Sequence, residues 1–182
     1  MTTTIIDEIF TLFRTFGRLS YGEEVTQMEH ILQCAHVARS DGASDALVAA
    51  ALLHDIGQFQ DDAGNAAEKK EIDARHEVTG AAYLAHYFPE SVTEPVRLHV
   101  EAKRYLCAAE PGYIDALSRA SALSLALQGG PHDAREMAAF LALPGAQDAI
   151  QLRRYDDMGK QPDHAAPDLE SYRGLLESVL RG

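Results

Sequence analysis

Helical periodicity runs through nearly the whole chain, and it limits the fold more than any other feature. In IIDEIFTLFRTF, residues 5–16, apolar side chains return every three or four positions, which places them on one face of an α-helix. Similar spacing continues along most of the chain, and strand-like alternation is nearly absent. We therefore expect an all-α helical bundle. The predicted helices cover residues 3–16, 25–40, 45–57, 70–87, 91–105, 113–127, 132–141, 145–157 and 168–180.

The breaks between these helices do not resemble domain linkers. They fall at short segments rich in Gly, Asp, Ser or Pro, such as SDGAS at 40–44, where Ser44 is suited to cap a helix. Residues 158–167, MGKQPDHAAP, are predicted to loop over the surface before the last helix. A chain of 182 residues has the size of one ordinary domain, so we expect a single domain over residues 1–182.

The chain is acidic, with a formal net charge of −12, and this charge disfavours nucleic acid and anionic membranes as partners. No apolar run approaches the ~20 residues that span a bilayer, and the first residues, MTTTIIDEIF, do not resemble a secretion signal. Cys34 and Cys107 are too few for a disulfide framework. These features favour a cytoplasmic protein, and nothing in them indicates a required protein partner.

Four of the eight histidines stand on predicted helices among small or apolar neighbours, namely His30, His54, His76 and His99. They are separated by 24, 22 and 23 residues, so neighbouring helices of a bundle could direct all four imidazoles to one point. A single buried histidine is more often hydrogen-bonded in a core than bound to a metal. The set, joined by Asp55 directly after His54, instead predicts a transition-metal site.

Carboxylates are expected to complete this site. Asp55 follows an Ala- and Leu-rich run and could bridge two cations, and LRRYDDMGK offers Asp156 or Asp157 late in the chain, with Asp156 favoured. A second His-Asp pair, His132-Asp133, follows Gly-Gly-Pro at a predicted helix start. An acid there complements the helix dipole and faces water, so we expect this second pair to be solvated.

The order of these residues resembles the HD-domain superfamily, whose members bind metals in an all-helical bundle and are mostly phosphohydrolases. His76 and His99 make the chain similar to the subset that holds two metal ions. The resemblance implies one ion on His30, His54 and Asp156, a second on His76 and His99, and a shared Asp55. Such a set of imidazoles and carboxylates suits non-haem iron and leaves room for substrate and dioxygen, although zinc or manganese would also bind.

A narrower resemblance covers nearly the whole chain. YGEEVTQMEH, RHEVTGA, HVEAKRYL, LRRYDD and the S-x-x-S-x-x-x-Q-G-G stretch over 121–130 look like segments of the mixed-valent diiron oxygenases of this superfamily. The likeness is to those that cleave the C–P bond of 1-hydroxy-2-aminoethylphosphonates, and myo-inositol oxygenase is a more distant relative. The resemblance implies one Fe(II), one Fe(III), dioxygen as co-substrate and a small phosphonate substrate in organophosphonate catabolism.

Carried over residue by residue, the resemblance makes Tyr21 a removable iron ligand and directs Glu24 to the substrate hydroxyl or to displacing that tyrosine. Both residues lie in a Gly-containing loop, which suits a gate and equally an ordinary capping loop. Lys103 stands one helical turn after a predicted histidine ligand, and Arg153 stands three residues before Asp156. Both are therefore placed to bind an anion at the metals.

Two hydroxyl groups and one amide extend the predicted substrate site. Ser121 and Ser124 share a helix face and would either donate to the anion or simply pack that helix. Gln58 follows HDIG where relatives that act on the primary amine carry another histidine, so an N-methylated substrate is favoured. Tyr21, Tyr105 and nearby acids could receive its cation. The favoured reaction converts [1-hydroxy-2-(trimethylamino)ethyl]phosphonate to glycine betaine and phosphate.

Two other functions use the same residues. An HD phosphohydrolase would activate water with an identical metal site and attack a nucleotide or another phosphate ester. A non-enzymatic HD domain would hold a structural metal and act as a sensor. Structural metal sites are usually closed, whereas the predicted ligand set leaves open positions, which argues against the sensor.

Overall fold

The computed structural model describes residues 4–20, 23–60 and 75–181, and all regular secondary structure in these ranges is helical. The predicted all-α class is therefore confirmed. The α-helices are α1 (Ile5–Phe16), α2 (Gln27–Ser40), α3 (Asp45–Leu53), α4 (Ile56–Phe59), α6 (His76–Leu84), α7 (Glu90–Ala109), α8 (Arg119–Leu127), α9 (Ala134–Leu141), α10 (Ala146–Met158) and α11 (Arg173–Ser178). Two 3-10 helices are η2 (Ile114–Ala116) and η3 (Leu169–Tyr172).

Side-chain caps begin several of these helices where the sequence predicts a start. Thr4, Thr26 and Asp133 each form a capping box with the acid three residues later. Ser44 accepts a hydrogen bond from the backbone N–H of Leu47. The four helices that follow these caps begin within two residues of their predicted starts.

Three predicted helices are interrupted. The helix expected over 45–57 is wrong as a single element, because α3 and α4 are separated by a turn at His54 and Asp55, where Asp55 has φ −93° and ψ 7°. This turn directs α4 against α6. Ser118 caps α8 and so divides the helix expected over 113–127, and the last predicted helix is divided into η3 and α11. Residues 70–74 of the helix predicted over 70–87 lie outside the described residues.

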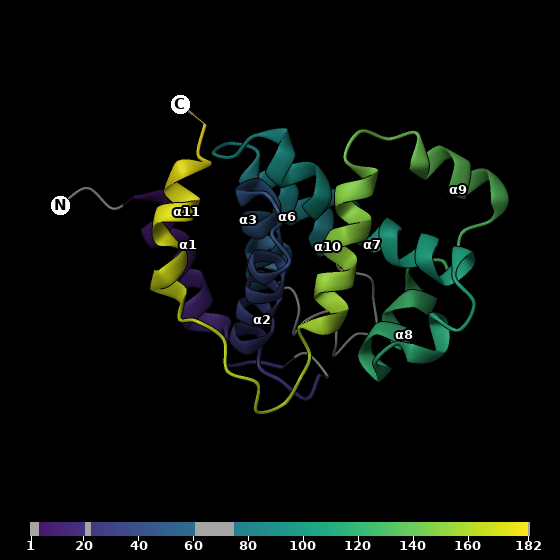
Figure 1. The fold of residues 1–182 in the computed structure, drawn as a ribbon, viewed down its shortest axis with the longest axis horizontal. Coiled ribbons are helices and arrows are strands. Elements are labelled where there is room, and N and C mark those ends of the chain that lie inside the picture. Colours follow the sequence, from purple (N-terminus) through teal and green to yellow (C-terminus); the bar gives the residue numbers. More distant parts are fainter. Residues whose placement is uncertain (1–3, 21–22, 61–74, 182) are drawn as a thin grey trace.

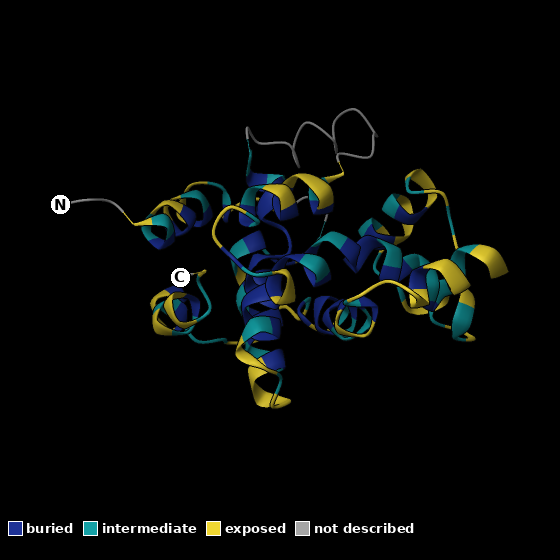
Figure 2. Ribbon diagram, turned by 90° about the horizontal axis from the view of Figure 1, so that it is seen from above, coloured by how far each residue is buried: buried dark blue, intermediate teal, exposed yellow. Residues whose placement is uncertain are grey.

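Most of the buried residues lie on the helices at the centre of the molecule, and the other helices pack around these. Figure 1 shows α1 and α11 side by side at the end of the molecule where both termini lie, α2, α3 and α6 in the middle, and α8 and α9 at the other end. α10 packs along α7, and α2 packs along α3. Figure 2 shows buried residues on the inward faces and exposed ones on the outside. None of the described helices is long and apolar enough to cross a membrane.

The main core joins the apolar faces of the helices at the left and centre of Figure 1, and a smaller cluster joins α7, α9 and α10. The smaller cluster contains Leu98 and Phe140, and Tyr105 packs on Phe140 with ring centroids 5.4 Å apart. Tyr105, which the sequence offered as a receiver for a cation, thus takes part in this packing. That the chain is a single domain stays a prediction.

The second His-Asp pair differs from its prediction in one of its two residues. His132 is buried, and its ring packs on that of Phe140. Its backbone N–H donates to the carbonyl of Arg104, and its Nε2 lies 2.6 Å from Glu101 Oε2. Asp133 is exposed and caps α9. The expectation of a solvated pair is therefore wrong for His132, whose ring packs beneath α9 instead.

Candidate metal centre

Histidine side chains from four elements meet between the central helices. His30 comes from α2, His54 from the turn after α3, His76 from the first position of α6 and His99 from the middle of α7. His30, His54 and His99 are buried and His76 is nearly so. Consecutive ring centroids, taken in the order His30, His54, His99 and His76, are 5.1, 5.2 and 5.2 Å apart. The structure thus brings together the four histidines that the sequence selects.

The imidazoles form two close pairs with one carboxylate between them. The Nε2 atoms of His30 and His54 are 3.2 Å apart, and those of His76 and His99 are also 3.2 Å apart. Asp55 Oδ1 lies 3.2 Å from His76 Nε2. Its other oxygen, Oδ2, lies 3.7 Å from His54 Nε2 and 3.8 Å from His30 Nε2. Each carboxylate oxygen therefore faces one pair, as in a bridging ligand.

The remaining ring nitrogens of three histidines bond to backbone carbonyl oxygens. The Nδ1–O distances are 2.9 Å for His30 with Gly159, 2.9 Å for His54 with Ala51 and 2.7 Å for His99 with Val96. Because a carbonyl only accepts, Nδ1 carries the proton and Nε2 presents its lone pair in each ring. Lone pairs that face each other at short range repel unless a cation lies between them. This orientation is the one that metal-binding histidines adopt, so the residues fit a metal ion at each pair.

The ionisation of the cluster also suits metal binding. Burial lowers the pKa of His30 and brings the pKa of His99 well below its usual value, so both rings are neutral. Burial opposes ionisation of Asp55, but the imidazoles around it hold its pKa well below the usual range. For His76, Asp55 outweighs burial and raises the pKa. His30 and His99 therefore offer neutral nitrogen ligands beside an ionised carboxylate, whereas Asp55 favours the protonated form of His76.

Of the two late carboxylates, Asp156 is the one at the histidines. Its Oδ1 lies 3.5 Å from His30 Nε2, and its Oδ2 accepts a 2.7 Å hydrogen bond from Arg153 Nη1. Burial opposes ionisation of Asp156, but Arg153 and Lys160 hold its pKa well below the usual range. Asp157 turns away and bonds to Arg153 and to the hydroxyl of Tyr113.

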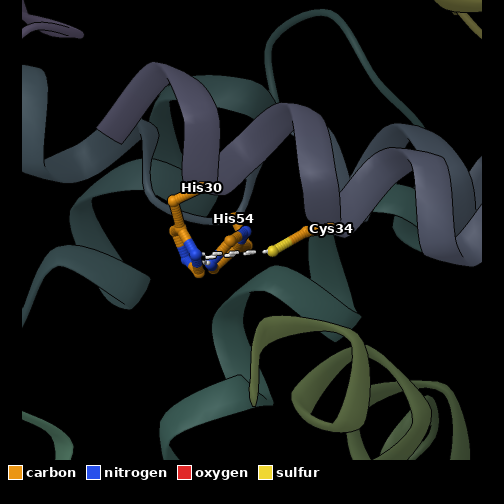
Figure 3. Close-up of side chains that lie close together, drawn as sticks. All are labelled: His30, Cys34 and His54. Carbon is orange, nitrogen blue, oxygen red and sulfur yellow. Dashed lines mark hydrogen bonds between the residues drawn. The ribbon is translucent and has the colours of Figure 1, made fainter. Parts of the chain in front are cut away.

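A cysteine that the sequence analysis did not select lies behind the first histidine pair. Figure 3 shows Cys34 and His30 projecting from the same helix, with the ring of His54 against that of His30. The Cys34 Sγ atom is 3.7 Å from His30 Nδ1 and 3.8 Å from His30 Nε2. Burial raises the pKa of Cys34 well above its usual value, which favours the neutral thiol over the thiolate that binds metals. The ligand atoms of Cys34, His30 and His54 all lie within 4.8 Å of one another.

Two glycines, which the sequence analysis also passed over, bring His76 to Asp55. A Cβ atom on Gly57 would overlap the carbonyl oxygen of His76 and would lie 2.8 Å from its carbonyl carbon and from Thr79 Oγ1. One on Gly80 would lie 3.0 Å from the backbone nitrogen of Gly57. Helices α4 and α6 therefore touch through their glycines. The available signal was an isolated glycine, Gly57 at the end of one predicted helix and Gly80 inside another, since such a glycine often marks a close backbone approach.

Lys103 is a buried cation beside this cluster. Its Nζ donates a 2.7 Å hydrogen bond to Ser124 Oγ, and none of the carboxylates in the described parts of the chain forms an ion pair with it. Burial, assisted by the nearby charge of Arg153, lowers the pKa of Lys103 to about 7. A cation that has a hydroxyl partner and lacks a carboxylate partner is suited to receive an anion.

Lys160 is a second, largely buried cation at the site, and unlike Lys103 it was not predicted from the sequence. Its Nζ lies 2.9 Å from Ser121 Oγ, 3.1 Å from Glu23 Oε1 and 3.3 Å from Asp156 Oδ1. Burial alone would lower the pKa of Lys160, but Asp156 raises it, so the ammonium group is charged. The only signal in the sequence was its position four residues after Asp156, across a glycine.

Arg153 differs from its predicted environment. Its guanidinium bonds to Asp156, Asp157 and the Tyr113 hydroxyl and lies 3.4 Å from Ser121 Oγ. The forked donor that the sequence offers to a substrate is therefore occupied by carboxylates in this structure. Both predicted serines lie beside cations, Ser121 at Lys160 and Ser124 at Lys103.

The predicted gate residues are placed only in part. Tyr21 lies outside the residues that the structure describes, so its role stays a prediction. Glu24 is exposed, whereas Glu23 turns inward and accepts a 2.8 Å hydrogen bond from the Ser118 hydroxyl. Of these two acids, the structure brings Glu23 to the site. Gln58 is partly exposed on α4, three residues after Asp55.

Comparison with known proteins identifies the class of this fold and site. The model of the HD domain family matches residues 28–142, a segment that includes five of the six predicted metal ligands. The chain is thus an HD-domain protein.

Individual relatives define a narrower group. The chain is 43% identical over 176 residues to hydroxymethylphosphonate dioxygenase of Gimesia maris, covering 96% of this chain and 88% of the relative. It is 41% identical over 177 residues to [1-hydroxy-2-(trimethylamino)ethyl]phosphonate dioxygenase (glycine-betaine-forming) of Leisingera caerulea, covering 97% and 90%. An uncharacterised protein, L432, of Acanthamoeba polyphaga mimivirus is 32% identical over 178 residues, covering 96% and 81%.

The chain belongs to the HD-domain phosphonate dioxygenase family. The resemblance found from the sequence motifs is confirmed, and the cluster of imidazoles and carboxylates fits a metal-dependent oxygenase.

Proposed function

We propose that this protein uses dioxygen to cleave the carbon–phosphorus bond of a 1-hydroxyphosphonate. One observation carries the proposal: two histidine pairs that share Asp55 lie beside buried cations, of which Lys103 has no carboxylate partner among the described residues. The paired histidines with their shared carboxylate suit a pair of metal ions, and the buried cations suit an anionic substrate. Two relatives are named for phosphonates that carry a hydroxyl group on the carbon bonded to phosphorus.

Two iron ions in a mixed-valent Fe(II)/Fe(III) state are the proposed cofactor. His30, His54 and Asp156 would hold one ion, His76 and His99 the other, and Asp55 both. Two imidazoles with one or two carboxylates suit non-haem iron and leave positions free for other ligands. When bound, the iron pair supplies Lewis acidity and activates dioxygen, the co-substrate.

The protein's own residues bind and orient the substrate. Lys103, with the Ser124 hydroxyl fixed against it, would bind the phosphonate, and the anion in turn would favour the charged form of the lysine. Arg153 and Lys160 keep Asp156 ionised and hold it at His30. The Ser121 hydroxyl, between these two cations, would donate to a second phosphonate oxygen.

The loop before α2 is proposed as a gate. Tyr21 would occupy a metal position until substrate arrives, and Glu24 would contact the substrate hydroxyl or displace that tyrosine. The inward-turned Glu23 supports a link between this loop and the site, since it joins Lys160 and Ser118. In this arrangement Glu24 must move inward from its exposed position when substrate binds.

Within the 1-hydroxyphosphonates, we propose [1-hydroxy-2-(trimethylamino)ethyl]phosphonate as the substrate and glycine betaine and phosphate as the products. The neutral amide of Gln58 supports a trimethylated amine, which has no N–H group to donate a hydrogen bond. Hydroxymethylphosphonate, which carries no amine, is the competing substrate. A cytoplasmic location and the absence of a required protein partner stay predictions.

Turnover of the iron-loaded protein tests the proposal. Phosphate release and dioxygen consumption are measured with hydroxymethylphosphonate and with 1-hydroxy-2-aminoethylphosphonate bearing zero to three N-methyl groups. Equal amounts of the two signals, both lost without oxygen, are expected. Anaerobic release of phosphate from an ester would instead identify an HD phosphohydrolase. A higher kcat/KM for hydroxymethylphosphonate would overturn only the choice of substrate.

The iron state is tested separately. Metal analysis should give two irons per chain, and electron paramagnetic resonance of the partly oxidised protein should show a half-integer coupled spin. A single zinc ion without that signal would refute the diiron centre.

A further inference from the structure

One short segment contacts both ring nitrogens of His30. Asp156, in the last turn of α10, places Oδ1 3.5 Å from Nε2. Gly159, directly after α10, accepts a 2.9 Å hydrogen bond from Nδ1–H through its carbonyl. The backbone N–H of Gly159 donates in turn to the carbonyl of Tyr155, which fixes the segment at the end of the helix. The orientation of His30 therefore depends on how closely this segment approaches α2.

Gly159 lies where no side chain fits. A Cβ atom there would be 3.0 Å from the carbonyl oxygen of His30 and 3.1 Å from the backbone nitrogen of Cys34, and it would overlap Cys34 Sγ. The backbone at Gly159 has φ −80° and ψ 26°, a conformation that alanine also adopts. The constraint on Gly159 is therefore the lack of space against α2 and not its own backbone.

The segment after α10 is held to α2 on its other side. The buried Gln33 accepts a 3.0 Å hydrogen bond from the backbone N–H of Gln161. The amide nitrogen of Gln33 donates to the carbonyls of Gln161 and His164, at 2.9 and 3.1 Å. Because these bonds hold the segment against the helix, it cannot retreat from an added methyl group without loosening the contact with His30.

We propose that Gly159 is a positioning residue for the metal centre, which acts by letting its carbonyl reach His30 Nδ1. This inference rests on the metal centre proposed above and not on the substrate. In a variant with a side chain at this position, the carbonyl withdraws and His30 loses the partner that fixes its tautomer and ring orientation. Loss of such a partner typically lowers metal affinity about 10–100-fold.

Gly159→Ala tests the proposal, with Gly174→Ala as a matched control. Gly174 lies on α11, and a Cβ atom there would meet nothing within 4 Å. In an anaerobic Fe(II) titration of the apoprotein, Gly159→Ala should show a dissociation constant about 10–100-fold larger than that of the wild type for one of the two ions. The control should bind as the wild type does. Equal affinities in Gly159→Ala and wild type would overturn the proposal.

A second comparison isolates the steric cause. Cys34→Ala removes the sulfur atom that the new methyl group would overlap, so the loss caused by Gly159→Ala should be smaller in that background. The double variant also serves if the single variant does not fold. An undiminished loss in the Cys34→Ala background would contradict the steric argument.

Nitrogen NMR of the apoprotein provides a readout that requires no metal. The wild-type His30 ring should be protonated at Nδ1, and Gly159→Ala should shift this ring towards the other tautomer. If the tautomer shifts as expected but the wild type binds no iron, the proposed metal centre fails, while the role of Gly159 in orienting His30 stands. An unchanged tautomer in Gly159→Ala would overturn that role.

Discussion

Gly57→Ala should remove one ion of the proposed metal pair without altering any of its ligands. A Cβ atom at this position would overlap the carbonyl oxygen of His76 and would lie 2.8 Å from its carbonyl carbon, whereas ordinary contacts begin near 3.4 Å. Helix α6 must therefore retreat by at least the 0.6 Å between these two distances. His76 is the first residue of α6, so it moves with the helix away from Asp55 and His99.

This displacement is large on the scale of metal coordination. Metal–ligand distances in proteins usually lie within about ±0.2 Å of their preferred values, so His76 can no longer share an ion with His99. Overpacking of this kind also costs about 1–3 kcal/mol of stability. For a chain of this size, that cost lowers Tm by about 2–12 °C.

Metal content after reconstitution with iron, together with thermal unfolding, measures both effects. We expect the iron content of Gly57→Ala to fall from two ions towards one per chain, with helical circular dichroism retained. Gly174→Ala introduces the same methyl group in open space on α11 and should keep both ions. A Gly57→Ala protein that binds two ions with wild-type affinity would refute the argument that close contact between α4 and α6 builds this half of the site.

Three further predictions follow from the same geometry. Burial lowers the pKa of Lys103 to about 7, so the free protein loses this positive charge as pH rises through 7. Above that pH, phosphonate binding measured by calorimetry should weaken by up to about tenfold per pH unit. Lys103→Arg should flatten this pH dependence, because arginine stays charged. Metal added at about 100 times its dissociation constant should stabilise the folded protein by about 2.7 kcal/mol. A thermal shift assay would record this as a rise in Tm of about 5–11 °C. The absence of a rise would argue against ions at the facing imidazoles. His76→Ala or His99→Ala should abolish dioxygen-dependent phosphate release, and continued turnover would show that a single ion is sufficient.

The sequence predicts the helices and the central histidines because both depend on local features. Periodic apolar residues determine which helix faces are buried, and capping side chains such as Thr26 and Ser44 mark the starts. Buried polar residues are costly, so histidines set among apolar neighbours indicate a site before any contact is known. The break between α3 and α4 was not predictable in the same way, because the apolar run continues through it, and the close packing of Gly57 against α6 that follows is a contact between separate helices.

The contacts that orient the site residues are likewise of two kinds, those within one helix and those between separate helices. His54 and His99 each bond through Nδ1 to a carbonyl three residues earlier, at Ala51 and Val96, so one helical turn orients each ring. His30 instead uses Gly159, which lies 129 residues later in the chain. Lys160 and Glu23 are likewise paired across the fold, and spacing along the chain did not indicate this pairing. The orientation of two imidazoles is thus encoded within single helices, whereas that of His30 requires α10 to dock on α2. Changes at the end of α10 should therefore act first on the ion proposed at His30, and changes between α4 and α6 on the ion proposed at His76.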